Sequence, residues 1–528
     1  MYSCPGCGSQ MVFDIPSQGL KCGRCERTMT VAEADEKEAR TAGGSFTVEQ
    51  MNCPTCGAEI RAVNTAAAAF SSYCGSSVML EQQEMKIDPQ SYIIPFQITR
   101  EACFEKYRQM LGKSFCADHS LRKSITADSF RGIYVPYHVY QAWAEGIIEI
   151  EGTETKGNDT YYYKSEVELN HRYTGIMHDA SREMPDSISE HINMSRDCTD
   201  LFRPFSPAYL SGFYADMPDT DPDKYLDYAR SEAIRKGLED TMPALKADSL
   251  HYSVSSTEKQ LMKVAGAEYA GDTMLPVWFM SMKSKGRMLY AVQNAVTGEM
   301  WADIPMDIRR FGLVAAGLAA VLFVLFAFLK ALPSLKPEMV MIAAMALAIF
   351  AQIAVNGQRT KIRDSELARA TADSGAVSMK EQVTRMHRLK KQVRRQQNGN
   401  IGRYLSAAGI GVGLVAAMHI LKGLGNPMIY KLAAPALTVA MLLLILPIGP
   451  KRSKLPPGSV AALAAMAAGC VLMILDPFHS RDLPVYIVCF VILAAVVWEC
   501  LDLLRLHNRA CSNPVPQFES HTGGEDRA

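Results

Sequence analysis

The residues best able to do chemistry are cysteines near the N-terminus, which form two pairs with two residues inside each pair and fourteen between the pairs. They are Cys4, Cys7, Cys22 and Cys25. Each C-x2-C pair forms a tight turn whose two thiolates converge on one ion, and Gly8 and Gly23 relieve the backbone there. Four thiolates at this spacing suit tetrahedral zinc. A redox C-x-x-C would be a single pair beside a βαβ pattern, which the sequence lacks, so we predict a zinc ribbon over residues 1–30.

The pattern starts again at Cys53 and Cys56, and Cys74 follows. Ser71 stands where the fourth cysteine is expected, and no histidine occurs in residues 1–118. This second ribbon, residues 49–82, then binds zinc with water as fourth ligand, borrows a group, or folds without metal. An open zinc position is a feature of catalytic sites, but neither cysteine pair has a neighbouring general base. We therefore expect a degenerate structural ribbon with these three cysteines as metal ligands, and no enzyme activity.

The formal net charge of zero conceals two oppositely charged halves. Residues 1–306 hold 30 Lys+Arg against 42 Asp+Glu, whereas residues 307–528 hold 25 against 13. The ribbons alone, residues 1–90, hold seven basic and eleven acidic side chains. Phosphate neutralisation supplies most nucleic-acid affinity, so nucleic-acid binding is not expected.

Six apolar runs in the basic half have about the ~17–25 residues that a helix needs to cross a bilayer. They are residues 311–329, 339–355, 404–421, 432–448, 459–475 and 483–501. The fifth run is rich in alanine, which leaves a count of five open. The loop between the second and third runs, residues 356–403, holds twelve Lys+Arg. The positive-inside rule then places both termini of this multi-pass protein in the cytosol.

The expected fold is multi-domain: zinc ribbons, a soluble α+β region and a polytopic α-helical membrane domain. The expected parts are 1–30, zinc ribbon; 31–48, acidic linker with a short helix; 49–82, second ribbon; 91–306, α+β region; 311–355, two spans; 356–403, basic helical loop; 404–504, four spans; and 505–528, polar tail.

Within the α+β region we expect Thr99 to cap a helix reaching about residue 115. Strands are expected at 92–96, 132–140, 146–150, 161–169 and 251–255, with a helix at 221–242. An antiparallel meander at 275–282, 288–293 and 299–304 closes the region, with turns at 283–286 and 294–298.

Other candidate sites are weak. Gly112-Lys113-Ser114 resembles the end of a phosphate-binding loop, but Tyr107 replaces the required first glycine. The scattered histidines show no metalloprotease or triad spacing. His419 and Glu499 are the ionisable groups inside the apolar runs, both near run ends, so the spans carry no transport signature. A basic stripe at 385–395 could bind anionic lipid, or only fix topology.

Several segments resemble the bacterial zinc-ribbon membrane proteins labelled transcription-factor-IIB-type. Besides the cysteines, they are 94–96 (IPF), 132–136 (GIYVP), 205–214 (FSPAYLSGFY), 275–278 (LPVW) and 292–298 (VQNAVTG). The resemblance covers residues 1–310, and relatives commonly have fewer spans. It implies a membrane anchor or scaffold that works with phage-shock-protein-A-type envelope-stress proteins and flotillin-like partners.

We therefore expect a zinc-ribbon adaptor that recruits a cytosolic or peripheral protein to the membrane. The alternative is a small-molecule or lipid transporter or channel with a metal-binding cytosolic regulatory domain. A membrane-tethered nucleic-acid binder is the weakest hypothesis, because the ribbons are acidic.

Overall fold

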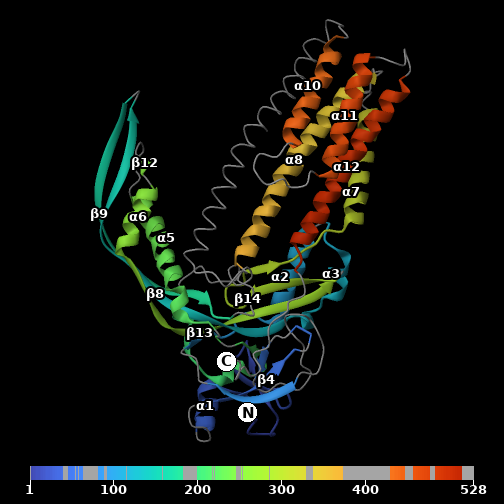
Figure 1. The fold of residues 1–528 in the computed structure, drawn as a ribbon. Coiled ribbons are helices and arrows are strands. Elements are labelled where there is room, and N and C mark those ends of the chain that lie inside the picture. The colour runs from blue at the N-terminus through green and yellow to red at the C-terminus, as the bar shows by residue number, and fades with distance from the viewer. Residues whose placement is uncertain are drawn as a thin grey trace, which may run out of the picture.

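The computed structural model describes most of the chain, and the parts of the molecule follow one another along a single direction (Figure 1). The described residues are 2–39, 46–53, 55–56, 59–62, 81–87, 92–114, 116–156, 159–181, 199–216, 218, 220–244, 251–252, 254–284, 286–328, 337–372, 428–445, 456–475 and 482–513. The N-terminal strands lie at one end, a mixed α/β body lies in the middle, and apolar helices form the other end.

The first ribbon is a small antiparallel sheet. Its strands are β1 (Met11–Asp14), β2 (Gly19–Cys22) and β3 (Thr28–Met29). The expected short helix follows as α1 (Val31–Ala39). It starts with a capping box, in which the Thr30 hydroxyl accepts from Glu33 N at 3.2 Å and the Glu33 carboxylate accepts from Thr30 N at 2.9 Å. Because Ala34 is fully buried, this part of the acidic linker packs on the body.

The body is built on one sheet of twelve described strands. They are β4 (Phe46–Asn52), β5 (Glu59–Ala62), β6 (Glu81–Ile87), β7 (Tyr92–Ile93), β8 (Arg131–Lys156), β9 (Asp159–Asp179), β10 (Arg203–Pro204), β11 (Tyr214–Ala215), β12 (His251–Tyr252), β13 (Ala265–Ser284), β14 (Arg287–Asn294) and β15 (Met300–Ala302). The main path runs β10-β7-β13-β8-β11-β5-β4-β6. Strands β4, β5 and β6 overlap the second ribbon expected at 49–82, extend beyond it at both ends, and continue the sheet of the body. The expected meander is confirmed as β13, β14 and β15, which pair antiparallel.

Strand β8 replaces two shorter strands expected at 132–140 and 146–150. A bulge between Tyr140 and Ala142, together with Gly146 at φ 140°, bends the strand without ending it. Beyond the bend, β8 and β9 form a long hairpin that rises on the same side of the body as the apolar helices (Figure 1).

The described helices of the body partly follow the expected pattern. They are α2 (Arg100–Lys113), α3 (His119–Ser124), α5 (Leu226–Ala244) and α6 (Val254–Val264), with short 3-10 turns η1 (Ala127–Ser129), η2 (Thr199–Leu201), η3 (Pro207–Leu210) and η4 (Pro222–Tyr225). The Thr99 cap is confirmed, since its side chain accepts from Ala102 N. The strand expected at 251–255 is wrong beyond Tyr252. Helix α6 forms there because it buries Leu261 among the apolar side chains of β8 and β9.

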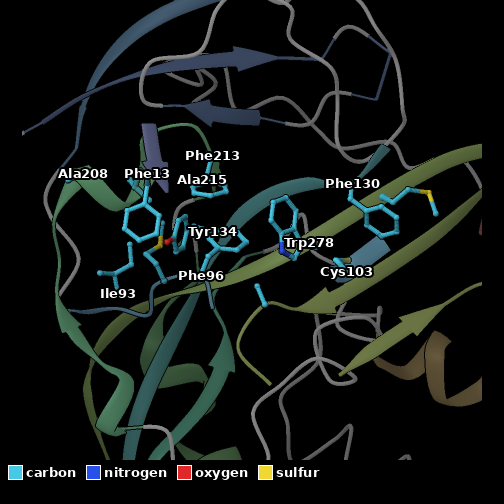
Figure 2. Close-up of a cluster of buried hydrophobic side chains, with 14 of the residues drawn as sticks. Phe13, Ile93, Phe96, Cys103, Phe130, Tyr134, Ala208, Phe213, Ala215 and Trp278 are labelled. Atoms are coloured by element: carbon cyan, nitrogen blue, oxygen red, sulfur yellow. The ribbon is translucent and has the colours of Figure 1, made fainter. Parts of the chain in front are cut away.

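Aromatic rings from distant segments form the central core of the body (Figure 2). Phe96 stacks on Phe213 with centroids 4.2 Å apart, and it also contacts Tyr134 at 5.1 Å and Trp278 at 5.0 Å. Phe13 of β1 joins them, 6.4 Å from Phe213. The first ribbon and the body therefore share one hydrophobic core.

Five described helices form the apolar end. They are α7 (Ile308–Phe328), α8 (Pro337–Ala372), α10 (Met428–Ile445), α11 (Pro457–Leu475) and α12 (Leu483–Ala510). By length and hydropathy, three are able to cross a membrane: Val340–Ile362, Pro457–Leu475 and Leu483–Ala510. The apolar part of α10, Leu432–Ile445, is shorter, and α7, which lies at the first expected span, is not one of the three. The expected span at 404–421 and the basic stripe at 385–395 lie outside the described residues. The structure therefore supports three of the six expected spans, and the prediction of six is not supported.

The end of α12 is tied to the body by side-chain and backbone hydrogen bonds. Asn508 accepts from Met306 N at 2.7 Å and donates to Met306 O at 2.8 Å. Asn513 and Met288 exchange two backbone bonds of 2.9 Å, and Arg287 donates to the Ser512 hydroxyl at 2.7 Å. The body and the apolar helices are thus connected both by the chain at α7 and by the end of α12.

Candidate metal centre

Two backbone turns position the four cysteines. In the first, Cys4 N donates to Ser9 O at 2.8 Å and Gly8 N donates to Cys4 O at 2.9 Å. Gly8 has φ 73°, which confirms the expected role of this glycine. In the second turn, the left-handed residue is Glu26 at φ 58°, rather than Gly23.

The four sulfurs converge as their spacing predicts. The Sγ–Sγ distances are 3.4 Å for Cys4–Cys25, 3.5 Å for Cys7–Cys22 and 3.6 Å for Cys7–Cys25. All four sulfurs lie within 4.8 Å of one another. With Zn–S bonds of about 2.3 Å, a tetrahedron has sulfur–sulfur edges of about 3.8 Å. The cluster could therefore hold a metal ion, and in the described part of the chain it is the one group of three or more such side chains with this geometry.

Backbone donors around the first turn favour thiolates. The pKa of the Cys7 thiol is lowered to about 6, first by the backbone N–H of Ser9 and then by the Ser9 hydroxyl. The Gly6 N–H, 3.4 Å from Cys4 Sγ, likewise lowers the pKa of Cys4. Two of the sulfurs are thus prepared to bind a cation.

Cys25 shows the cost of bringing four thiols together. The Arg27 backbone N–H lowers its pKa, but the neighbouring thiols of Cys4 and Cys7 outweigh that effect and raise the pKa to about 12. A cation at the centre would remove this repulsion, since it offsets the charge of all four thiolates. Four sulfur ligands leave no open coordination position, which is the pattern of a structural site.

The second ribbon is only partly described. Cys53 and Cys56 are buried, with 1% and 3% of their surface exposed. Cys74 and Ser71 lie outside the described residues, so the expected three-cysteine set stays a prediction.

The segments that carry the family resemblance lie in the core of the body. Phe96, Tyr134, Phe213 and Trp278 each come from a different one of them (Figure 2). A Cβ at Gly132 would lie 2.4 Å from the Phe213 ring, so only glycine fits there. These motifs therefore specify packing.

The structure brings together histidines that looked scattered in the sequence. His138 and His178 are cross-strand partners on β8 and β9, and His138 Nδ1 lies 2.6 Å from Asp272 on β13. His178 stacks on Tyr225 at 3.7 Å, and burial lowers its pKa to about 4. The alternation of side chains along each strand could have placed His138 and His178 on one face of the sheet. Without the register of β8 against β9, however, the sequence could not show that the two are neighbours.

A second group missed by sequence reasoning lies among the apolar helices. Glu499 is 3% exposed and accepts a hydrogen bond from the Ser459 hydroxyl. Gln352 lies against both. In the sequence, Glu499 is only an ionisable group near the end of an apolar run, whereas the packing of α8, α11 and α12 encloses it.

The structure thus defines a mixed α/β protein with a four-cysteine cluster that could hold a metal ion at one end and apolar helices at the other. Over 332 residues it is similar, at 21% identity, to the uncharacterized protein YdjG of Bacillus subtilis strain 168. The alignment covers 61% of this chain and 95% of YdjG. No family model and no solved structure matches the chain.

Proposed function

We propose that this protein is a membrane adaptor of the bacterial inner membrane. The four cysteines bind one structural zinc ion, the ribbon end of the molecule recruits a soluble or peripheral protein, and the apolar helices hold that protein at the bilayer.

The observation that carries this proposal is the placement of the ribbon at the end of the body opposite the apolar helices (Figure 1). With the helices in a membrane, the first ribbon lies on the side of the body away from the bilayer. Cys25 is exposed there, as are Gly6 and Arg24 beside the cluster. A protein in the cytosol can reach this surface without displacing lipid.

The ribbon is joined to the body firmly enough to carry a partner. Phe13 N donates to Ser211 O at 2.9 Å, and the buried Ser211 hydroxyl donates to Met11 O at 2.8 Å. The Gln18 side chain donates to Phe96 O at 2.8 Å. A protein held by the ribbon would therefore be connected through the body to α12.

The resemblance to transcription-factor-IIB-type zinc-ribbon membrane proteins names the kind of partner: a phage-shock-protein-A-type or flotillin-like protein. A cytosolic location for both termini and anionic lipid binding at 385–395 belong to the same proposal. Nucleic acid remains a poor partner, because the ribbons are acidic.

The test compares co-purification of proteins with the full-length tagged chain from native membranes, after nuclease treatment. Cys25→Ser is the variant of choice, since this exposed thiol contributes to the cluster and not to the core, unlike Cys4 and Cys22. Cys116→Ser is the matched control outside the cluster. We expect Cys25→Ser to lose at least tenfold of a specific partner while remaining in the membrane. Equal recovery of the partner with both variants would refute recruitment by the ribbon.

Transport is the second candidate function, and one observation favours it. The buried Glu499 cluster is the kind of intramembrane polar group that marks ion pathways. Ion flux or lipid scrambling in proteoliposomes that is lost on substitution in α12, and retained in Cys25→Ser, would favour this candidate.

A further inference from the structure

Three polar side chains from three helices meet inside the apolar bundle. Gln352 of α8, Ser459 of α11 and Glu499 of α12 are 1%, 0% and 3% exposed. The Ser459 hydroxyl donates to Glu499 Oε1. One terminal atom of the Gln352 amide lies 2.7 Å from Glu499 Oε2, 3.2 Å from Oε1 and 3.1 Å from Ser459 Oγ.

The backbone is adapted to this contact. A Cβ at Gly458 would lie 2.7 Å from Glu499 Cγ and 3.1 Å from Glu499 N, so glycine lets α11 and α12 touch at this level. That approach places Ser459, the next residue, against the carboxylate. Asn356, one turn after Gln352, bonds Gln352 at 3.0 Å and donates to Leu444 O of α10 at 3.3 Å. Four helices therefore position the group.

We propose that Glu499, Ser459 and Gln352 form a binding site for one monovalent cation, either a proton or an alkali ion. A carboxylate removed from water among apolar helices needs a neutralising charge. By rotating its amide, Gln352 can contact Glu499 both when the carboxylate is bare and when it holds a cation or a proton. Its nitrogen donates to the bare carboxylate, and its oxygen faces a bound cation or the O–H of the protonated group.

The charged surroundings limit the alternatives. Arg359 on α8 and Asp502 on α12 act electrostatically on Glu499, and Cys500 adjoins it. Helix α11 contains no charged residue. Lys431 is near the start of α10, far from Leu444. Arg359 is thus the side chain of the protein that could neutralise Glu499 in place of a bound cation. The experiment must distinguish neutralisation by Arg359 from neutralisation by a bound cation.

The site lies on the helix that contacts the body. Asn508, which bonds Met306, is nine residues beyond Glu499, about 14 Å along α12. Cation binding at the site can therefore change how α12 seats on the sheet. This inference does not depend on the adaptor function.

The experiment measures thermal unfolding of the full chain in lipid nanodiscs. Sodium chloride is compared with choline chloride at equal ionic strength, and pH is varied separately. Glu499→Gln keeps the shape of the side chain but removes its charge and replaces one acceptor oxygen by a donor NH2, and Asp482→Asn at the other end of α12 is the control. If sodium is the ligand, we expect it to raise the Tm of the wild type and of Asp482→Asn by about 2 °C or more, and not that of Glu499→Gln.

If the proton is the ligand, sodium has no effect, and the pH dependence of Tm is smaller in Glu499→Gln than in the wild type by the part that Glu499 contributes. Ser459→Ala, which keeps the charge, should weaken sodium binding or shift the pH midpoint without abolishing the response. Identical responses of the wild type and Glu499→Gln to both sodium and pH would overturn the proposal and leave Arg359 as the countercharge.

Discussion

In the first ribbon, β1 and β2 pair over four residues, and the sheet ends at sulfurs 3.4–3.6 Å apart. In the second ribbon, β4 and β6 pair over seven residues, and β5 connects them through β11 to β8 of the body. The first ribbon thus depends on side chains that meet at one point. The second is stabilised by backbone hydrogen bonds that extend into a larger sheet. Two segments with similar cysteine spacing are therefore stabilised differently, one by a sulfur cluster and the other by pairing with a larger sheet.

The largest expected effect is therefore on the first ribbon when metal is removed. Structural zinc supplies about 10–16 kcal/mol of apparent folding free energy in isolated fingers. Here the shared core with the body offsets part of that loss. We expect a strong chelator to abolish amide-exchange protection in residues 2–30 and leave β8 and β13 protected. Mass spectrometry of exchanged peptides measures both regions in one sample. Equal loss in the ribbon and the body, or no loss in either, would contradict a metal-held ribbon.

The contact between the first ribbon and the body should give the next largest effect. Phe13 is 5% exposed and packs on Tyr209 and Phe213 at 5.3 and 6.4 Å. Phe13→Ala should cost about 3 kcal/mol of stability, and Phe13→Leu about 1 kcal/mol. Denaturant unfolding of the metal-loaded protein measures both. If the alanine variant matched the leucine variant, the ribbon would not depend on this core.

Much of the first ribbon could be predicted because its determinants are local. Cys4 and Cys7, three positions apart, converge in one turn, so spacing alone indicates the cluster. Thr99 and the meander around Gly298 are local in the same sense: a cap bonds within one helical turn, and a turn at φ 76° needs glycine.

The body and the apolar helices are different, because their determinants meet only in the folded chain. Phe96 and Trp278 lie 182 positions apart in sequence but have ring centroids 5.0 Å apart. Helix α6 forms where a strand was expected, since burial of Leu261 outweighs local preference. Glu499 looked like a run-end carboxylate until Ser459 and Gln352 were placed around it. No spacing rule connects such residues.

The pH dependence of stability is a further difference between the body, where His178 is buried by packing, and the first ribbon, which holds the thiolates. His178 has its pKa lowered from 6.5 to about 4 by burial. Between these values the unfolded chain binds a proton that the folded chain does not, so stability falls as pH drops from 6.5 to 4. His178→Phe, which keeps a ring on Tyr225, should reduce this loss by about 2 kcal/mol. His171→Gln is the control, and chemical unfolding at pH 7, 5.5 and 4.5 is the measurement. The pH dependence left in His178→Phe then comes from other groups, the thiolate site among them, and an unchanged profile would show that His178 does not contribute.

The smallest effect is expected in the second ribbon. Cys53 is buried, and its strands are already held by β4–β6 pairing. Because backbone pairing already holds these strands, we take the metal-free alternative for the second ribbon here, in place of the three-cysteine site expected from the sequence. Cys53→Ser should then leave one zinc per chain and lower stability by about 1 kcal/mol, the cost of a buried polar group in place of a thiol. Cys25→Ser should instead take the zinc content toward zero. Elemental analysis of the purified full-length variants measures this difference. Two zinc ions per wild-type chain, falling to one in Cys53→Ser, would mean that the second ribbon also closes around metal and that the two ribbons are stabilised alike.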